Sequence, residues 1–181
     1  MADGDPRLIC LLRAVNVGGR NRVPMGALRE ELARAGVPHV TTMLASGNLL
    51  VPWSGSTEIL QSMIEKVILE AFEVVTTCMV VHPHEVLDLL AEPTSDRGEL
   101  SPSQQLVIIL DHAPDEADEA ARELEGIAMG SAHLSGRFVV QRCPDGVSNA
   151  PGLVPFMESR WHLTATARNR RTIDRLLEAV R

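Results

Sequence analysis

The stretch Leu11–Met25, LLRAVNVGGRNRVPM, combines residue types from which proteins build anion sites. Arginine holds phosphate and carboxylate groups bidentately, and glycine lets the backbone approach a ligand closely. Pro24 is typical of the start of a helix, where free N–H groups and a partial positive charge attract anions. The SGN stretch further along adds a hydroxyl and an amide. The candidate ligand-binding residues are Arg13, Asn16, Gly18, Gly19, Arg20, Asn21, Arg22, Ser46 and Asn48.

The same residues have an explanation that needs no ligand. Asparagine and glycine supply the left-handed backbone of any tight loop. The sequence GGRN is neither GxGxxG nor a phosphate loop that ends in Lys-Ser or Lys-Thr. Arg13 has a further alternative, a buried ion pair with a carboxylate. The stretch therefore predicts either an anion site or a well-formed turn, and both interpretations stay open.

A secondary polar cluster lies nearer the C-terminus, in CPDGVSN and ARNRR. Each stretch follows a predicted strand, and both strands run toward the same edge of the predicted sheet. We therefore expect these residues to meet there and to form a second polar site. The alternative is that they are simply a solvated surface without a ligand. The residues of this cluster are Asp145, Gly146, Ser148, Arg168 and Asn169.

Other catalytic chemistry finds little support in the sequence. His82 and His84 surround a proline without a third ligand at a fixed spacing, so no metal is expected, and no cofactor motif is present. The acid-rich stretch DHAPDEADEAARELE is typical of the first turns of a helix rather than of a catalytic carboxylate pair. There is no G-x-S-x-G motif and no recognisable triad order, so catalytic residues are not assigned.

Composition limits the possible partners. The chain has 181 residues, of which 45% are hydrophobic and 23% charged, which is typical of a globular protein. The net charge of −7 argues against nucleic acid, and so do the first and third predicted strands, whose one aromatic residue, Trp53, sits at a strand end. No apolar run has membrane-spanning length, and the stretch MADGDPR has two acidic residues and no apolar core, so we do not expect it to act as a signal peptide. The three cysteines are far apart in the sequence and fit buried thiols, so we expect a cytoplasmic protein. The expected partner is a small anionic molecule.

Hydrophobic patterning predicts the element order βαββαβ twice. The predicted strands are 8–15, 39–45, 49–53, 74–81, 105–110, 127–133, 137–142 and 163–167, and the predicted helices are 25–35, 57–71, 84–91, 114–124, 152–160 and 169–180. This order predicts an α+β chain of two tandem ferredoxin-like plaits with antiparallel sheets, plus a C-terminal helix. The predicted domains are residues 1–82, a connector with a short helix and a loop at 83–104, and residues 105–181. In such a plait the NVGGRNR loop and the SGN turn lie at one edge of the sheet.

The stretches LLRAVNVGGRNRVPM and ASGNLLV, and more loosely CPDGVSNAPG and ATARNRRTIDRLLE, resemble the bacterial family called domain of unknown function 1697. The resemblance implies tandem ferredoxin-like subdomains and assigns no activity. It also has departures. Members usually carry Ser-Lys-Leu where this chain has Ala150, Pro151 and Gly152, Trp where it has Arg170, and Gly where it has Ala14. The N-terminal stretch is therefore the safer place for a shared function.

The sequence favours a protein that binds a small or phosphate-bearing ligand with the NVGGRNR loop and the SGN turn. One alternative is an enzyme that acts on a phosphorylated or anionic substrate in a cleft between the subdomains, with groups from the secondary cluster. The other alternative is a structural or protein-interaction module. The sequence does not give the ligand or the oligomeric state.

Overall fold

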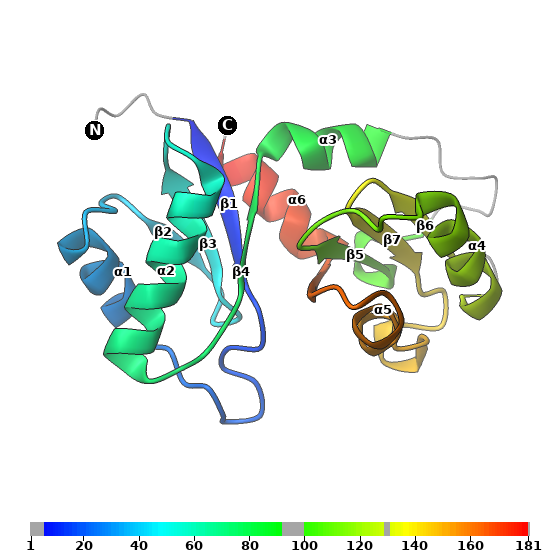
Figure 1. Ribbon diagram of the computed structural model, residues 1–181, viewed down its shortest axis with the longest axis horizontal. Coiled ribbons are helices and arrows are strands. Elements are labelled where there is room, and N and C mark those ends of the chain that lie inside the picture. Colours follow the sequence, from blue (N-terminus) through cyan, green and yellow to red (C-terminus); the bar gives the residue numbers. More distant parts are fainter. Residues whose placement is uncertain (1–5, 92–99, 129–130, 181) are drawn as a thin grey trace. The chain divides into compact units, whose positions relative to one another are not determined.

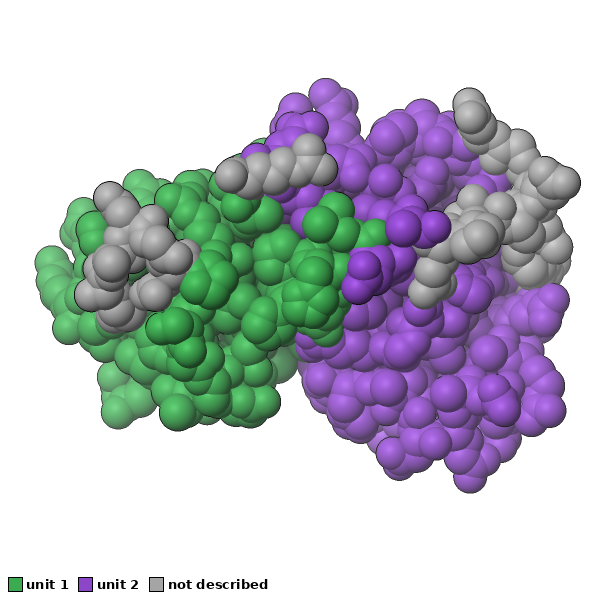
Figure 2. Space-filling model, turned by 90° about the horizontal axis from the view of Figure 1, so that it is seen from above, with its two compact units in different colours: residues 1–87, 179–181 green, residues 88–178 purple. Residues whose placement is uncertain are grey.

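The chain divides into two compact units, residues 1–87 with 179–181 and residues 88–178 (Figure 2). The computed structural model describes residues 6–91, 100–128 and 131–180. The division falls inside the helix that runs from Pro83 to Ala91. The boundaries predicted from the sequence, 1–82, 83–104 and 105–181, stay a prediction.

The first unit is one antiparallel sheet with helices on one face (Figure 1). Its strands are in the order β2-β3-β1-β4. The two helices α1 and α2 contribute their buried leucines, isoleucines and valine to the same core as β1, β3 and β4. The elements in chain order are β1 (Arg7–Leu12), α1 (Met25–Arg34), β2 (Thr41–Met43), β3 (Asn48–Pro52), α2 (Thr57–Phe72), β4 (Cys78–Val81) and α3 (Pro83–Ala91).

The central strand β1 sets the pairing of the strands in this unit. β1 is almost fully buried, and it pairs with β3 through Leu11 and Asn48 and with β4 through Leu12 and Cys78. A central strand buried on both faces reads as a continuous apolar run, as RLICLL does. The end of β1 and the start of β3 therefore lie side by side, which fixes where the following loop and the preceding turn must be.

The second unit repeats the same order of elements. Its antiparallel sheet has the strand order β6-β7-β5-β8, and α4 and α5 share its core with β5, β7 and β8. The elements are η1 (Pro102–Gln104), β5 (Gln105–Leu110), α4 (Ala117–Ile127), β6 (Ala132–Ser135), β7 (Phe138–Arg142), η2 (Val147–Asn149), α5 (Leu153–Trp161), β8 (Ala165–Asn169) and α6 (Arg170–Ala179).

Some element boundaries differ from the sequence prediction. The strand predicted at 127–133 begins only at Ala132, because α4 continues through Ile127. The strand predicted at 163–167 extends to Asn169, because Arg168 and Asn169 pair with Val107 and Leu106 of β5. These two polar residues therefore lie in β8 rather than in a loop after it.

The predicted α+β class is confirmed: the described residues form two four-stranded antiparallel sheets and six α-helices. The finer assignment to ferredoxin-like plaits stays a prediction at this point. The three cysteines are buried, as expected from the sequence. No helix within the described ranges is long and apolar enough to cross a membrane.

Candidate anion-binding site

The loop between β1 and α1 is built from left-handed residues. Ala14, Asn16, Gly18, Gly19 and Asn21 all have positive φ angles. The backbone N–H of Asn16 donates to the carbonyl of Asn21 at 2.9 Å, and the Asn21 side chain donates to the carbonyl of Ala14 at 3.0 Å. These bonds close the loop on itself.

The side chain of Asn16 attaches this loop to its neighbours. Its Nδ2 donates to the carbonyl oxygens of Val23 at 2.9 Å and Ala45 at 2.7 Å, and its Oδ1 accepts from the N–H of Val23 at 2.8 Å. A primary amide has two N–H donors, and both are used here. Asn16 therefore holds the loop in place, and its assignment as a ligand-binding residue stays a prediction.

The SGN turn packs directly on the end of β1. Gly47 has φ +74°, and its carbonyl accepts from the N–H of Leu12 at 2.8 Å. A Cβ at Gly47 would lie 2.6 Å from Cγ2 of Val15 and 2.7 Å from Cβ of Leu12, so only glycine fits. Together with the bond from Asn16 to Ala45, this contact confirms the predicted proximity of the turn and the NVGGRNR loop.

Two of the predicted residues in this turn serve the turn itself. Asn48 is fully buried, and its Nδ2 donates to the carbonyl of Met43 at 2.9 Å and to Oγ of Ser46 at 3.0 Å. Ser46 and Asn48 thus hold the ends of the turn together.

A hollow of about 690 Å³ opens beside the loop, the turn and the first residues of α1. Four of the nine predicted residues line it: Asn16, Gly19, Arg20 and Arg22. Its other described lining residues are Val23, Pro24, Met25, Thr42, Leu44 and Ala45. Arg13, Gly18, Asn21, Ser46 and Asn48 are not among the described residues that line it.

Arg13 has a different place from the other arginines. It is half-buried, its backbone N–H donates to the carbonyl of Thr77 at 2.9 Å, and its carbonyl accepts from Oγ1 of Thr76 at 2.7 Å. Its backbone thus connects the end of β1 to the segment that leads into β4.

The electrostatics of the hollow favour an anion. Arg20 and Arg22 are exposed, and neither guanidinium has a hydrogen bond or ion pair within the described residues. None of the described lining residues is acidic. Pro24, the N-cap of α1, has no side-chain bond to the helix, and the first turn contains no acidic residue. The N–H groups of that turn therefore keep their partial positive charge.

A third arginine, which the sequence did not single out, lies close to the hollow. Arg29 of α1 donates from Nη1 to Oγ1 of Thr42, a lining residue. Its Nη2 is 4.0 Å from the position of a Cβ at Gly26, so the side chain reaches back over the first turn of α1. The spacing of one helical turn between Met25 and Arg29 is the only signal in the sequence that points to this arrangement.

The secondary cluster is divided in the structure. Asp145 and Gly146 line a separate hollow of about 390 Å³. Ser148 is exposed in η2, and the described lining residues of that hollow do not include Ser148, Arg168 or Asn169. Nη1 of Arg168 donates at 2.9 Å to Oγ1 of Thr166 and to the carbonyl of Ala167.

Both arms of the secondary cluster still contact the η1 turn. Asn169 Nδ2 donates to the carbonyl of Ser103 at 2.9 Å, and Gln104 Nε2 donates to the carbonyl of Pro144 at 2.7 Å. The two segments therefore lie at the same sheet edge, as predicted. The side chains of Asn169 and Gln104 therefore connect these segments to η1, which is a structural role that needs no ligand.

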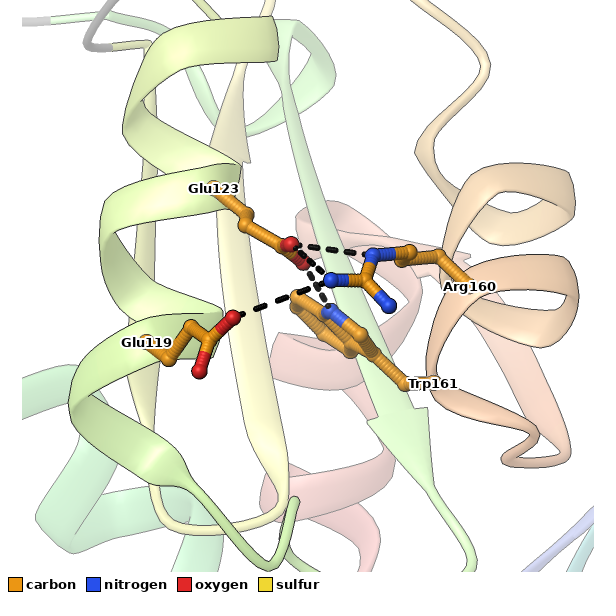
Figure 3. Close-up of polar contacts among 4 residues, drawn as sticks. All are labelled: Glu119, Glu123, Arg160 and Trp161. Carbon is orange, nitrogen blue, oxygen red and sulfur yellow. Dashed lines mark hydrogen bonds and ion pairs between the residues drawn. The ribbon is translucent and has the colours of Figure 1, made fainter.

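A polar network between α4 and α5 was not expected from the sequence (Figure 3). Glu123 accepts from Nε of Arg160 at 2.9 Å, from Nη2 at 2.6 Å and from Nε1 of Trp161 at 2.9 Å. The Trp161 and Arg160 donors hold the pKa of Glu123 below its ordinary value. The pKa of Glu116 is raised instead, through its hydrogen bond with Glu119 and the repulsion between the two carboxylates.

The two histidines at the start of α3 lie near each other. The ring centroids of His82 and His84 are 5.3 Å apart. Within residues 6–91, 100–128 and 131–180, no group of three or more His, Cys, Asp or Glu side chains is arranged to hold a metal ion.

The family described as "Protein of unknown function (DUF1697)" matches residues 6–135, and the chain belongs to this family. The matched range contains the NVGGRNR loop and the SGN turn and ends before the secondary cluster. The conserved bacterial protein SP0830 from Streptococcus pneumoniae has a similar structure, with a TM-score of 0.71 and 20% sequence identity. The likeness covers 97% of this chain and 99% of that chain, and it concerns the fold alone. No curated protein matches the chain.

Proposed function

We propose that this DUF1697 protein binds a small anionic molecule in the hollow beside α1. One observation carries the proposal. Two exposed arginines, Arg20 and Arg22, have no partner within the described residues at a hollow without described acidic lining, in a chain of net charge −7. Unneutralised arginines beside an uncapped helix N-terminus form a donor set suited to phosphate.

The acidic residues of α1 support the same proposal by their positions. Glu30 and Glu31 both pair with Arg34 at the far end of the helix. The N-terminal half of α1 instead carries Arg29, whose guanidinium is held by Thr42 next to the hollow. Both glutamates of α1 therefore have a cationic partner on the helix, and Arg29 is bonded to a residue that lines the hollow.

We also infer that each unit is a ferredoxin-like plait. The support is the element order βαββαβ and the strand orders β2-β3-β1-β4 and β6-β7-β5-β8, in which the first strand of each unit lies between the third and the fourth.

Binding can be tested by titrating inorganic phosphate and pyrophosphate and following thermal stability, since a ligand that binds only the folded state raises Tm. We expect Arg20→Gln and Arg22→Gln each to weaken binding by about tenfold, because each removes a charge-assisted contact. Arg122→Gln is the matched control, since Arg122 is an exposed arginine on α4 that does not line the hollow.

Two results would contradict the proposal. One is the absence of any Tm change with either anion at low and at moderate salt. The other is a change that Arg122→Gln reduces as much as Arg22→Gln does, because that result would mean general charge attraction.

A further inference from the structure

The residues that line the hollow beside α1 are of two chemical kinds. Arg20 and Arg22 are cationic, whereas Met25 and Leu44 are apolar. A bare inorganic anion would use only the cationic residues and would leave the apolar lining in contact with water.

Leu44 is the residue that the fold itself does not explain. Its side chain is 53% exposed, and its φ of +60° lies in the left-handed region, which leucine rarely adopts. The turn is closed by Gly47 and Asn16, and neither bond involves the Leu44 side chain. An exposed leucine in this conformation, on the lining of a hollow, fits contact with an apolar group of a ligand.

The size of the hollow leads to the same conclusion. Its volume of about 690 Å³ is within the range of sites for whole organic molecules, about 300–1,000 Å³. A phosphate group needs roughly the space of three water molecules, about 90 Å³. Most of the hollow would therefore remain for the organic group to which the phosphate is attached.

We infer that the ligand is an organic phosphate, a phosphate monoester on an apolar body, with the phosphate at Arg20 and Arg22 and the body against Met25 and Leu44. This inference rests on the proposed anion-binding function. A phosphate suits the donor set better than a carboxylate does. Two guanidinium groups, with five N–H donors each, exceed what two carboxylate oxygens accept, whereas a phosphate monoester offers three terminal oxygens and two charges.

The test compares dissociation constants for inorganic phosphate, phenyl phosphate and benzoate, measured by calorimetry on the full chain. For the wild type we expect phenyl phosphate to bind at least about tenfold more tightly than inorganic phosphate, because only the ester has an apolar group to contact Met25 and Leu44. Leu44→Asn should weaken phenyl phosphate binding about fivefold and leave inorganic phosphate unchanged. Asparagine tolerates the left-handed backbone, so this variant should fold without loss of Tm.

Leu69→Asn is the matched control, since Leu69 is 49% exposed on α2 and does not line the hollow. Equal affinity for inorganic and phenyl phosphate, or an unchanged preference in Leu44→Asn, would overturn the inference and leave the proposed function standing if Arg22→Gln still weakens phosphate binding. Benzoate binding as tight as that of phenyl phosphate would overturn the choice of phosphate. If neither phosphate compound binds, the proposed function itself is wrong.

Discussion

At the scale of single residues, Asn16 and Arg29 have places that the sequence does not predict. Asn16 is a structural residue of the loop, and Arg29 lies near the hollow. Asn16 uses both N–H donors and the oxygen of its amide to attach the NVGGRNR loop to Val23 and Ala45. Arg29 belongs to the regular face of a helix, yet its guanidinium reaches Thr42 at the hollow. Asn16 therefore holds the loop in place, and Arg29 adds a guanidinium next to the hollow that Arg20 and Arg22 line.

Replacing Asn16 tests this division. Asn16→Gly keeps the freedom to adopt a positive φ but removes three hydrogen bonds, so we expect a loss of about 2–3 kcal/mol in the free energy of unfolding. Asn21→Gly removes one exposed bond from a residue with the same backbone conformation and should cost about 1 kcal/mol or less. Urea denaturation of the two variants measures both values. Equal losses would mean that Asn16 does not hold the loop in place.

At the scale of elements, the pairing of strands could be predicted and the reach of side chains could not. Apolar runs such as RLICLL and the SGN turn determine the strand order, and the proximity of loop and turn follows from it. The sequence predicts a strand over 39–45, but β2 ends at Met43 and leaves Leu44 exposed. It predicts that the last strand ends at Ala167, whereas Arg168 pairs with Val107 and extends β8, because pairing with a neighbouring strand outweighs the low strand propensity of a polar residue.

The network between α4 and α5 gives a prediction that depends on pH. The pKa of Glu123 is lowered by Trp161 and Arg160, so its contribution to stability is complete above the ordinary glutamate value of about 4.3 and is lost as pH falls through the lowered pKa. Glu123→Gln should therefore lower Tm at neutral pH and lose this effect in acid.

Glu116→Gln is the control with the opposite sign. The pKa of Glu116 is raised by Glu119, so its protonated form favours folding and this benefit is lost as pH rises through the raised pKa. Glutamine at position 116 should raise Tm at neutral pH and bring no gain in acid. Scanning calorimetry across this pH range measures both variants. If both shift Tm in the same direction at neutral pH, the carboxylates do not act through the contacts described.

At the scale of the whole molecule, the exposed arginines Arg20 and Arg22 belong to a protein of net negative charge. The chain has 17 basic and 24 acidic residues, so its long-range field repels polyanions. The attraction of Arg20 and Arg22 extends only about one Debye length, roughly 8 Å at physiological salt. A small anion can bind within that distance, whereas a nucleic acid strand would extend beyond it into negative potential.

We therefore expect no saturable binding of a short single-stranded RNA at about 0.15 M salt. Strands that bind RNA expose aromatic side chains for base stacking, but β1 and β3 contain none and are almost entirely buried. Fluorescence anisotropy of a labelled strand measures this, with phenyl phosphate as the small-anion comparison. RNA binding that persists at this salt and is lost in Arg20→Gln and Arg22→Gln would show that the site accepts a polyanion, and the ligand would then have to be sought among nucleic acids.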